Sequence, residues 1–202
     1  MDAARLTKAS LDAAGLGAFF RPRDVKPLGV TLREIQRLTE EGVVERLARG
    51  LYRLTEVEPT ELESIAMVAG AIPKSIICLL SALQVHRIGT QAPHEVWIAL
   101  DRKARRPRHA PTSMRIVRFS GAMLTYGVQT RPMLGVPVSV TSPARTVVDC
   151  FRYRNKVGID VALEALREAL QARITTVSEI VRAAEVCRAR TVVQPYLQAF
   201  VA

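Results

Sequence analysis

Apolar residues recur with helical spacing near the start of the chain, and turn residues divide this pattern into short elements. Residues 3–14 predict a short helix that ends at Gly15. A second short helix is expected over residues 21–26, and the Pro- and Gly-containing segment 27–30 predicts a tight turn after it. The first thirty residues therefore predict two short helices joined by turns.

The clearest helical pattern covers residues 31–41. Thr31 and Glu34 fit a capping box, in which the Thr31 hydroxyl accepts from the Glu34 amide and the Glu34 side chain returns the bond. Gly42 suits the left-handed residue that ends a helix. The predicted buried stripe consists of Leu32, Ile35 and Leu38, and the opposite face carries Arg33, Gln36, Arg37 and Glu40.

Two short apolar stretches follow this helix. Residues 43–47 and 51–54 are joined by Ala48–Gly50 and predict a hairpin that carries several arginines. The order of helix, turn, capped helix and basic hairpin is typical of a winged helix-turn-helix DNA-binding domain, here expected over residues 1–56. The alternative is a small helical subdomain whose arginines only solvate its surface.

The residue types on this segment suit the two kinds of DNA contact. Arg and Gln on the predicted helix can reach guanine and adenine edges in a major groove. Arginines on the hairpin suit phosphates or a minor groove. The candidate DNA-binding residues are Thr31, Arg33, Gln36, Arg37, Arg46, Arg49 and Arg53.

Residues 57–202 mix strand and helix patterns and predict a second, regulatory α/β domain, a small sheet flanked by helices with a helical C-terminal half. After a linker at residues 55–59, helices are expected over residues 60–70, 79–88, 144–154 and 159–173, with strands over 95–100, 114–119, 128–133 and 136–140. Ser142 and Pro143 fit a helix start, and Thr176–Glu179 opens a last helical stretch. The predicted fold class of the whole chain is α+β.

Charge is unevenly distributed along the 202 residues. The net charge is +10 and the isoelectric point about 10.2, which favours a polyanion such as nucleic acid as partner. Residues 101–154 contribute most of it, because eleven Lys and Arg against two Asp and Glu give +9. Much of this charge lies in a polar loop over residues 101–113, outside the predicted DNA-binding domain.

The cysteine positions and the hydropathy pattern indicate the cellular setting of the protein. The three cysteines, Cys78, Cys150 and Cys187, are far apart in apolar stretches, so we expect them in the core rather than in a disulfide or zinc site. The start lacks the pattern of a secretory leader, and the longest strongly apolar run, residues 76–80, is too short to span a bilayer. We therefore expect a cytoplasmic protein with no membrane partner.

Signals of enzyme chemistry are weak. His86, His94 and His109 are too scattered for a metal site, and no phosphate-binding glycine loop is present. Asp101 and Lys103 match half of a metal-dependent nuclease motif, and the upstream acids Glu61, Glu63 and Glu95 lack a convincing context. We expect no catalytic residues, no metal and no cofactor.

Arg145 is unusual because a cation in the first turn of a helix opposes the helix dipole. It should have a specific partner, either Asp149 one turn later or an external anion. The candidate anion-binding surface of the second domain consists of Arg102, Lys103, Arg105, Arg106, Arg108, Arg115, Arg118 and Arg145. The alternatives for the loop are extra contact with the operator DNA and an ordinary solvated surface.

Several segments together resemble the AbiEi-like antitoxins of type IV toxin–antitoxin systems. The matching segments are residues 42–54, which contain RGLYRL, Ser81–Leu83 with His86, Val96–Ile98, and the TSPARTVVD stretch of residues 141–149. The resemblance implies a transcriptional repressor that binds a double-stranded DNA operator, autoregulates its operon and counteracts a nucleotidyltransferase-like toxin encoded beside it. It also implies that the basic surface opposes that toxin, directly or by competing for its substrate.

The sequence is therefore compatible with three functions. The first is a non-catalytic antitoxin and repressor, and the second is a stand-alone transcriptional regulator whose second domain binds a ligand or a protein. The third is the nuclease suggested by Asp101 and Lys103. An adjacent nucleotidyltransferase gene separates the first from the second, and metal-dependent cleavage would support the third.

Overall fold

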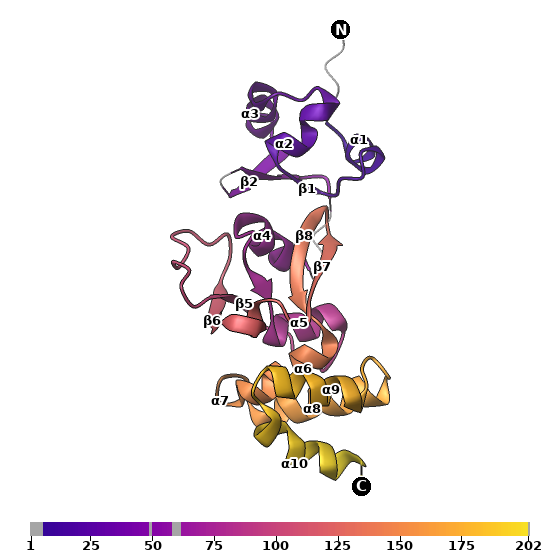
Figure 1. Cartoon of the computed structure of the whole chain (residues 1–202). Helices are drawn as coiled ribbons and strands as arrows, with labels where there is room; N and C mark the ends of the chain where they lie inside the picture. Colours follow the sequence, from indigo (N-terminus) through magenta and orange to yellow (C-terminus); the bar gives the residue numbers. More distant parts are fainter. Residues whose placement is uncertain (1–5, 49, 58–61, 202) are drawn as a thin grey trace. The chain divides into compact units, whose positions relative to one another are not determined.

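The computed structural model describes residues 6–48, 50–57 and 62–201 (Figure 1). Contacts between Cα atoms divide the chain into two units. Unit 1 contains residues 1–73, 107–112 and 131–138, and unit 2 contains the remaining segments, 74–106, 113–130 and 139–202. The predicted boundary after residue 56 assumes that residues 1–56 fold by themselves as a DNA-binding domain. This boundary stays a prediction.

The first elements of unit 1 form a winged helix-turn-helix. In chain order they are α1 (Lys8–Ala13), β1 (Phe19–Phe20), α2 (Pro22–Val25), the 3-10 helix η1 (Lys26–Leu28), α3 (Leu32–Glu40), β2 (Val44–Ala48) and β3 (Leu51–Leu54). The strands form an antiparallel sheet in the order β1–β3–β2. One face of this sheet and the helices enclose a core of Leu6, Leu11, Phe20, Val25, Val30, Ile35, Leu38, Val44, Tyr52 and Leu54.

The other face of the same sheet is covered by helix α4 (Glu63–Ala71). Strand side chains alternate between faces, so Leu51 and Arg53 point away from the core that holds Tyr52 and Leu54. Leu51 is 1% exposed and packs so closely on Gly70 of α4 that a methyl group at Gly70 would collide with it. Helix α4 therefore packs against the sheet of the winged helix-turn-helix within unit 1.

A second close approach in unit 1 brings the chain before β1 to residues 134–135. The Phe19 amide donates to the Leu134 carbonyl at 3.1 Å. Gly17 lies against the backbone of Leu134 and Gly135, where any Cβ would overlap backbone atoms. Gly17 is required at this point because only a residue without a side chain allows the two backbones to meet.

Five strands form the second sheet. They are β4 (Ile76–Ile77), β5 (Val96–Asp101), β6 (Met114–Phe119), β7 (Val128–Met133) and β8 (Val136–Thr141), arranged in the order β6–β5–β4–β8–β7. Strand β5 runs parallel to β6 and antiparallel to β4, which in turn runs parallel to β8. The sheet is therefore mixed, which together with the helices confirms the α+β class.

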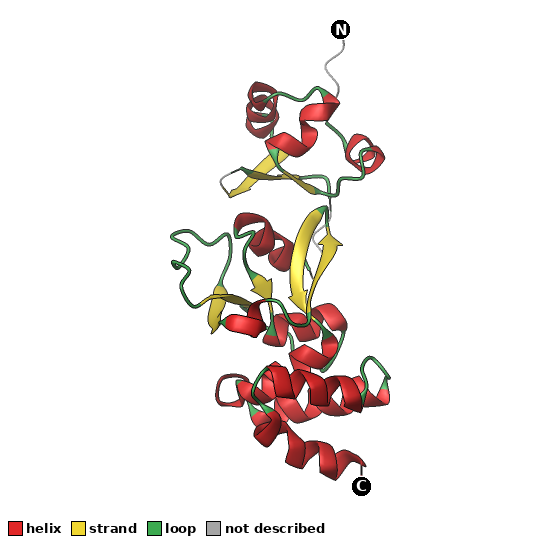
Figure 2. Ribbon diagram, viewed as in Figure 1, coloured by secondary structure: helices red, strands yellow, loops and turns green. Residues whose placement is uncertain are grey.

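Helices dominate the remainder of unit 2, as Figure 2 shows. They are α5 (Leu79–His86), the 3-10 helix η2 (Gly121–Leu124), α6 (Pro143–Arg152), α7 (Arg154–Val157), α8 (Ile159–Gln171), α9 (Val177–Val186) and α10 (Arg190–Val201). Helix α6 contacts α5, α8, α9 and α10, and residues 144–151 are all buried. Cys78, Cys150 and Cys187 lie in this core, as the sequence predicts.

Local sequence signals correctly predict several of the helix ends. Thr31 caps α3 by accepting from the Glu34 amide at 3.2 Å, and Gly42 adopts the expected left-handed conformation with φ of 74°. Thr176 and Glu179 form a complete capping box. Ser142 occupies the N-cap of α6 with Pro143 as its first residue, although its hydroxyl makes no capping bond.

Three details differ from the predictions. Leu32 is 54% exposed and so is not part of the buried stripe, because the first turn of α3 is left uncovered while Ile35 and Leu38 pack in the core. Helix α1 starts at Lys8 after a Thr7 cap, whereas residues 6–7 were expected within the helix. The last helical stretch is two helices, α9 and α10. The first two residues of the helix expected over residues 60–70 lie outside the described residues.

Candidate nucleic-acid interface

Helix α3 presents one continuous polar face. Ile35 and Leu38 anchor the helix in the core, and Thr31 fixes its first turn. The exposed residues Arg33, Gln36, Arg37 and Glu40 lie on one side of the helix, because Gln36 and Arg37 are each three or four residues from Arg33 and from Glu40. An open hollow among them is lined by Thr31, Arg33, Glu34, Gln36, Arg37 and Glu40. This face has the length and chemistry to contact base edges.

Arg37 lies between two carboxylates on that face. Its guanidinium is 3.9 Å from Glu34 and 3.6 Å from Glu41, with 57% of the side chain exposed. Exposed pairs of this kind contribute roughly 0–1 kcal/mol. Arg37 can therefore exchange these carboxylates for a DNA acceptor, while Arg33 and Gln36 form no salt bridge among the described residues.

The wing is the hairpin of β2 and β3. Arg46 lies on β2 in register with Tyr52, and its side chain is exposed while Tyr52 faces the core. The register shifts between Arg46 and Ala48, which places an irregularity next to the turn. Arg49, predicted at the tip, lies outside the described residues. Among the described arginines of the wing, Arg46 is the one whose side chain is exposed to solvent.

Arg53 differs from the other candidates. Its side chain is 18% exposed, its Nη2 lies 2.6 Å from Glu45, and its Nη1 pairs with Glu63 of α4. The expectation that Arg53 reaches phosphate conflicts with this geometry, because both ends of its guanidinium are held by carboxylates. Sequence reasoning missed Glu45 and Glu63 as partners, although Glu45 stands opposite Arg53 in a two-stranded hairpin.

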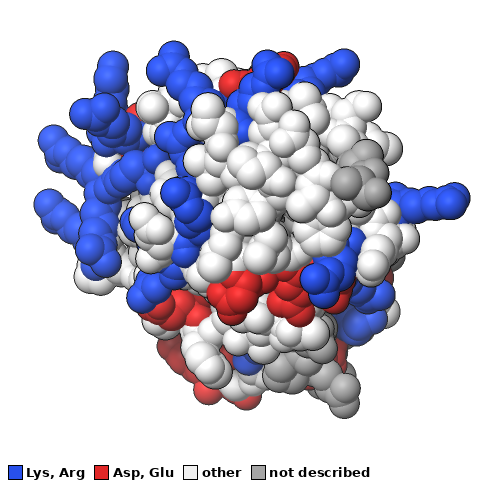
Figure 3. Space-filling model, turned by 90° about the horizontal axis from the view of Figure 1, so that it is seen from below, with Lys and Arg blue, Asp and Glu red and all other residues white. Residues whose placement is uncertain are grey.

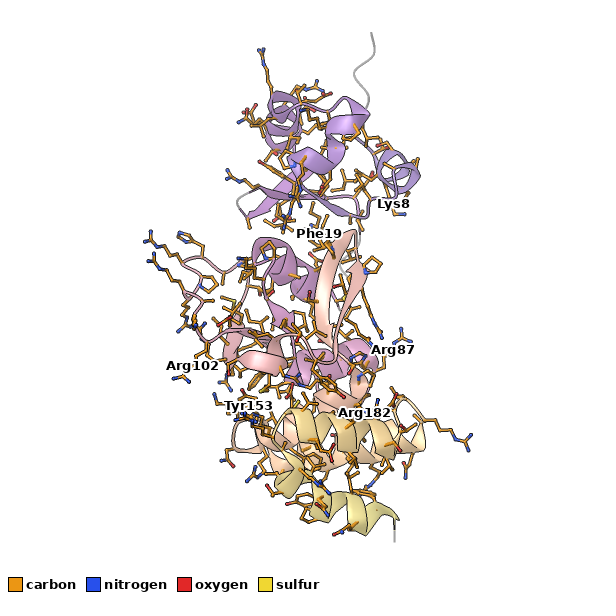
Figure 4. All side chains as sticks on the ribbon, viewed as in Figure 1. Lys8, Phe19, Arg87, Arg102, Tyr153 and Arg182 are labelled. Carbon is orange, nitrogen blue, oxygen red and sulfur yellow. The ribbon has the colours of Figure 1, made fainter. Side chains whose placement is uncertain are left out.

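The loop between β5 and β6 carries a dense group of cations. Arg102, Lys103, Arg105, Arg106 and Arg108 are all exposed and form no salt bridge within the described part of the chain. In Figure 4 Arg102 projects outward from the loop. On the face shown in Figure 3, Lys and Arg are densest along the left side of the view. Within this loop the cations are free to meet an external anion.

The base of the loop is held by internal bonds. Arg118 Nη1 donates to the carbonyls of Asp101 and Ala104 at 2.9 and 2.8 Å. Arg115 pairs with Glu95 at 3.2 Å and its guanidinium lies 5.0 Å from the centre of the Trp97 ring. Arg118 and Arg115 are thus exposed but already bound, which separates them from the loop cations that they flank.

Arg145 is not on that surface, which corrects its assignment to the anion-binding set. The side chain is 0% exposed, and its Nε donates to Asp149 Oδ2 at 2.8 Å. Its other nitrogens donate to the carbonyls of Tyr126 and Met123, at 2.8 and 3.2 Å. The guanidinium also stacks on Phe119, 4.9 Å from the ring centre. The internal partner expected from the sequence, Asp149, is confirmed.

The nuclease motif receives little support from the geometry. The Asp101 carboxylate accepts from the Lys103 amide at 2.7 Å and so closes a local turn. Two candidate upstream acids, Glu63 and Glu95, pair with Arg53 and Arg115, while Glu61 lies outside the described residues. In the described segments, no three His, Cys, Asp or Glu side chains cluster in a way that could hold a metal ion.

His86 makes an internal contact, and the three cysteines are buried. His86 Nε2 is 2.6 Å from the Thr141 carbonyl oxygen, where β8 ends. Burial raises the pKa of Cys78 and Cys150, and that of Cys187 to about 11, which keeps these thiols protonated. The described helices also include none with the length and apolar character needed to cross a bilayer.

The chain thus combines a winged helix-turn-helix, whose helix α3 carries an exposed polar face and whose wing carries the exposed Arg46, with a second, mixed sheet and further helices. Residues 11–55 match the family model described as "Transcriptional regulator, AbiEi antitoxin". The resemblance to AbiEi antitoxins is thus confirmed for this segment, which contains α2, α3 and the wing. The segment is less than half of the chain. No curated protein matches the chain.

Proposed function

We propose that this protein is a sequence-specific DNA-binding transcriptional repressor. The observation that carries the proposal is the exposed face of α3, where Arg33, Gln36 and Arg37 lie on one side of a helix whose opposite side is anchored by Ile35 and Leu38. Such side chains match acceptors and donors of guanine and adenine in the major groove. The match of residues 11–55 to a family of transcriptional regulators supports the same function.

The antitoxin half of the proposal rests on the family. The protein would repress its own operon and counteract a nucleotidyltransferase-like toxin encoded beside it. The exposed loop cations, Arg102 to Arg108, are the candidate surface for that activity, because they can bind the toxin or the acidic nucleic acid or nucleotide on which it acts. A nucleotidyltransferase gene next to this one would support this half directly.

A second candidate function is a stand-alone regulator whose second domain binds a protein or ligand. The observation that favours it is an apolar groove between α9 and α10 in unit 2. Its lining consists of Val177, Val181, Ala184, Arg190, Val193, Gln194, Leu197 and Gln198. Val177 and Val181 are each 36% exposed, so the groove offers apolar side chains to solvent.

Selection of duplexes from a random pool by the purified chain tests the central proposal. We expect one enriched sequence that also occurs upstream of the gene itself, and binding to it at least about a thousandfold tighter than to its scrambled version. Equal binding of enriched and scrambled duplexes would contradict sequence-specific repression. Binding without a toxin gene nearby would favour the stand-alone regulator.

A further inference from the structure

Arg53 occupies the centre of the small sheet. It lies on β3, the middle strand, in register with Glu45 of β2 on one side and with Phe19 of β1 on the other. Because its neighbours Tyr52 and Leu54 face the helical core, the Arg53 side chain points to the opposite face, the one covered by α4. The residue therefore connects the wing to α4.

Three charges meet at this point. The Arg53 side chain is 18% exposed and that of Glu63 15%, so this ion pair is largely shielded from water. Glu45 is 49% exposed and lies on the wing beside Arg46. Within the part of the chain that the structure describes, the Arg53 Nε has no hydrogen-bond partner, so the two terminal nitrogens make the contacts. A planar guanidinium can hold two carboxylates in this way, whereas an ammonium acts as a single point charge.

We propose that Arg53 is a positioning residue for DNA binding, one that neutralises Glu45 and Glu63 and holds the wing against α4 without touching DNA. The inference rests on the proposed function. Without Arg53, Glu45 would carry an uncompensated negative charge on the same hairpin as Arg46, the hairpin that must approach phosphates. Coulomb repulsion between Glu45 and the DNA would then weaken binding.

The test uses the full chain and its selected duplex, with affinity measured over a range of salt concentrations and referred to the folded, active fraction. The variants are Arg53→Gln, Arg53→Lys and the triple variant Arg53→Gln/Glu45→Gln/Glu63→Gln. The triple variant removes all three charges and so avoids a buried unpaired carboxylate if Arg53→Gln alone fails to fold. Arg46→Gln serves as the phosphate-contact reference and Arg173→Gln, exposed in unit 2, as the matched control.

We expect Arg53→Gln to weaken binding by about tenfold. The triple variant should bind within about threefold of the wild type, because the effects of the three neighbouring charges are coupled. The slope of log affinity against log salt should stay at the wild-type value in the triple variant and become shallower by about 0.9 in Arg46→Gln. Arg53→Lys should fall between wild type and Arg53→Gln.

Two results would overturn the inference while leaving the proposed function intact. A triple variant with weak binding and a slope shallower by about 0.9 would mean that Arg53 contacts phosphate. Unchanged affinity in the folded fraction of Arg53→Gln would mean that the residue acts on stability alone. If the wild-type chain showed no preference for any duplex, the proposed function and this inference would fail together.

Discussion

Arg145 donates from Nε to Oδ2 of Asp149 at 2.8 Å, and both side chains are fully buried. The second carboxylate oxygen, Oδ1, has no hydrogen-bond partner among the described residues. Arg145 also holds the carbonyls of Met123 and Tyr126, so the pair ties α6 to the segment between β6 and β7. A charged pair in this position is an internal support of unit 2.

Removal of one partner should be costly. Arg145→Met keeps an unbranched side chain but removes the cation and leaves Asp149 buried without it, and we expect a loss of about 3–5 kcal/mol in the free energy of unfolding. The double variant Arg145→Met/Asp149→Leu should recover most of this loss, since no buried charge remains. Denaturant unfolding measures both, and a loss under about 1 kcal/mol in the single variant would refute the supporting role.

The same pair predicts a pH dependence. Burial raises the pKa of Asp149 to about 6 from the ordinary 3.8, against the opposing effect of Arg145. The folded state then holds the proton more tightly than the unfolded state, so protonation stabilises the fold at low pH and this stability is lost as pH rises through about 6. Relative to Asp149→Asn, the wild type should gain about 1.4 kcal/mol between about pH 7.5 and about pH 5. Parallel pH profiles of the two proteins would show that no such shift exists.

The loop cations predict a separable antitoxin activity. Arg105→Glu/Arg106→Glu reverses two exposed charges without touching the bonds of Arg118 that hold the base of the loop. We expect the variant to lose protection against the neighbouring toxin in growing cells, with an unchanged circular dichroism spectrum. Arg182→Glu/Arg188→Glu, also exposed in unit 2, is the matched control and should protect fully. Equal protection by both variants would leave the loop as an ordinary solvated surface.

Fragments test how far the DNA-binding domain extends. A fragment of residues 1–56 lacks α4, so Leu51 would lose its cover and Arg53 would lose Glu63. We expect a fragment of residues 1–73 to be more stable by about 2 kcal/mol or more, the value of one buried leucine. Thermal unfolding of the two fragments measures the difference. Identical midpoints would support the boundary after residue 56.

The features that sequence predicted are those determined within a few neighbouring residues. The Thr31 cap, the left-handed Gly42 and the Thr176–Glu179 box each depend on residues at most three apart, which pattern and side-chain chemistry reveal. The order of helices and wing follows from such signals, and so does the polar face of α3. Arg145 and Asp149, one helical turn apart, are predictable for the same reason.

The features that sequence missed depend on tertiary packing. Strands β1 and β4 contain two residues each, too few to show an alternating pattern. The pairing of Arg53 with Glu63 depends on α4 returning over the sheet, and Leu32 is exposed because no described residue covers the first turn of α3. Whether an arginine faces DNA or a carboxylate is decided by such contacts, which explains why Arg53 was grouped with Arg46.

Base recognition by α3 is the central claim, and Gln36 tests it most directly because it contributes no charge to the interaction. The measurement is the affinity of Gln36→Ala for the selected duplex and for its scrambled version, at one salt concentration, with Gln171→Ala on the exposed side of α8 as control. The account predicts a loss of about 1–3 kcal/mol on the selected duplex alone, with relaxed base preference. Wild-type affinity of Gln36→Ala for both duplexes would contradict it.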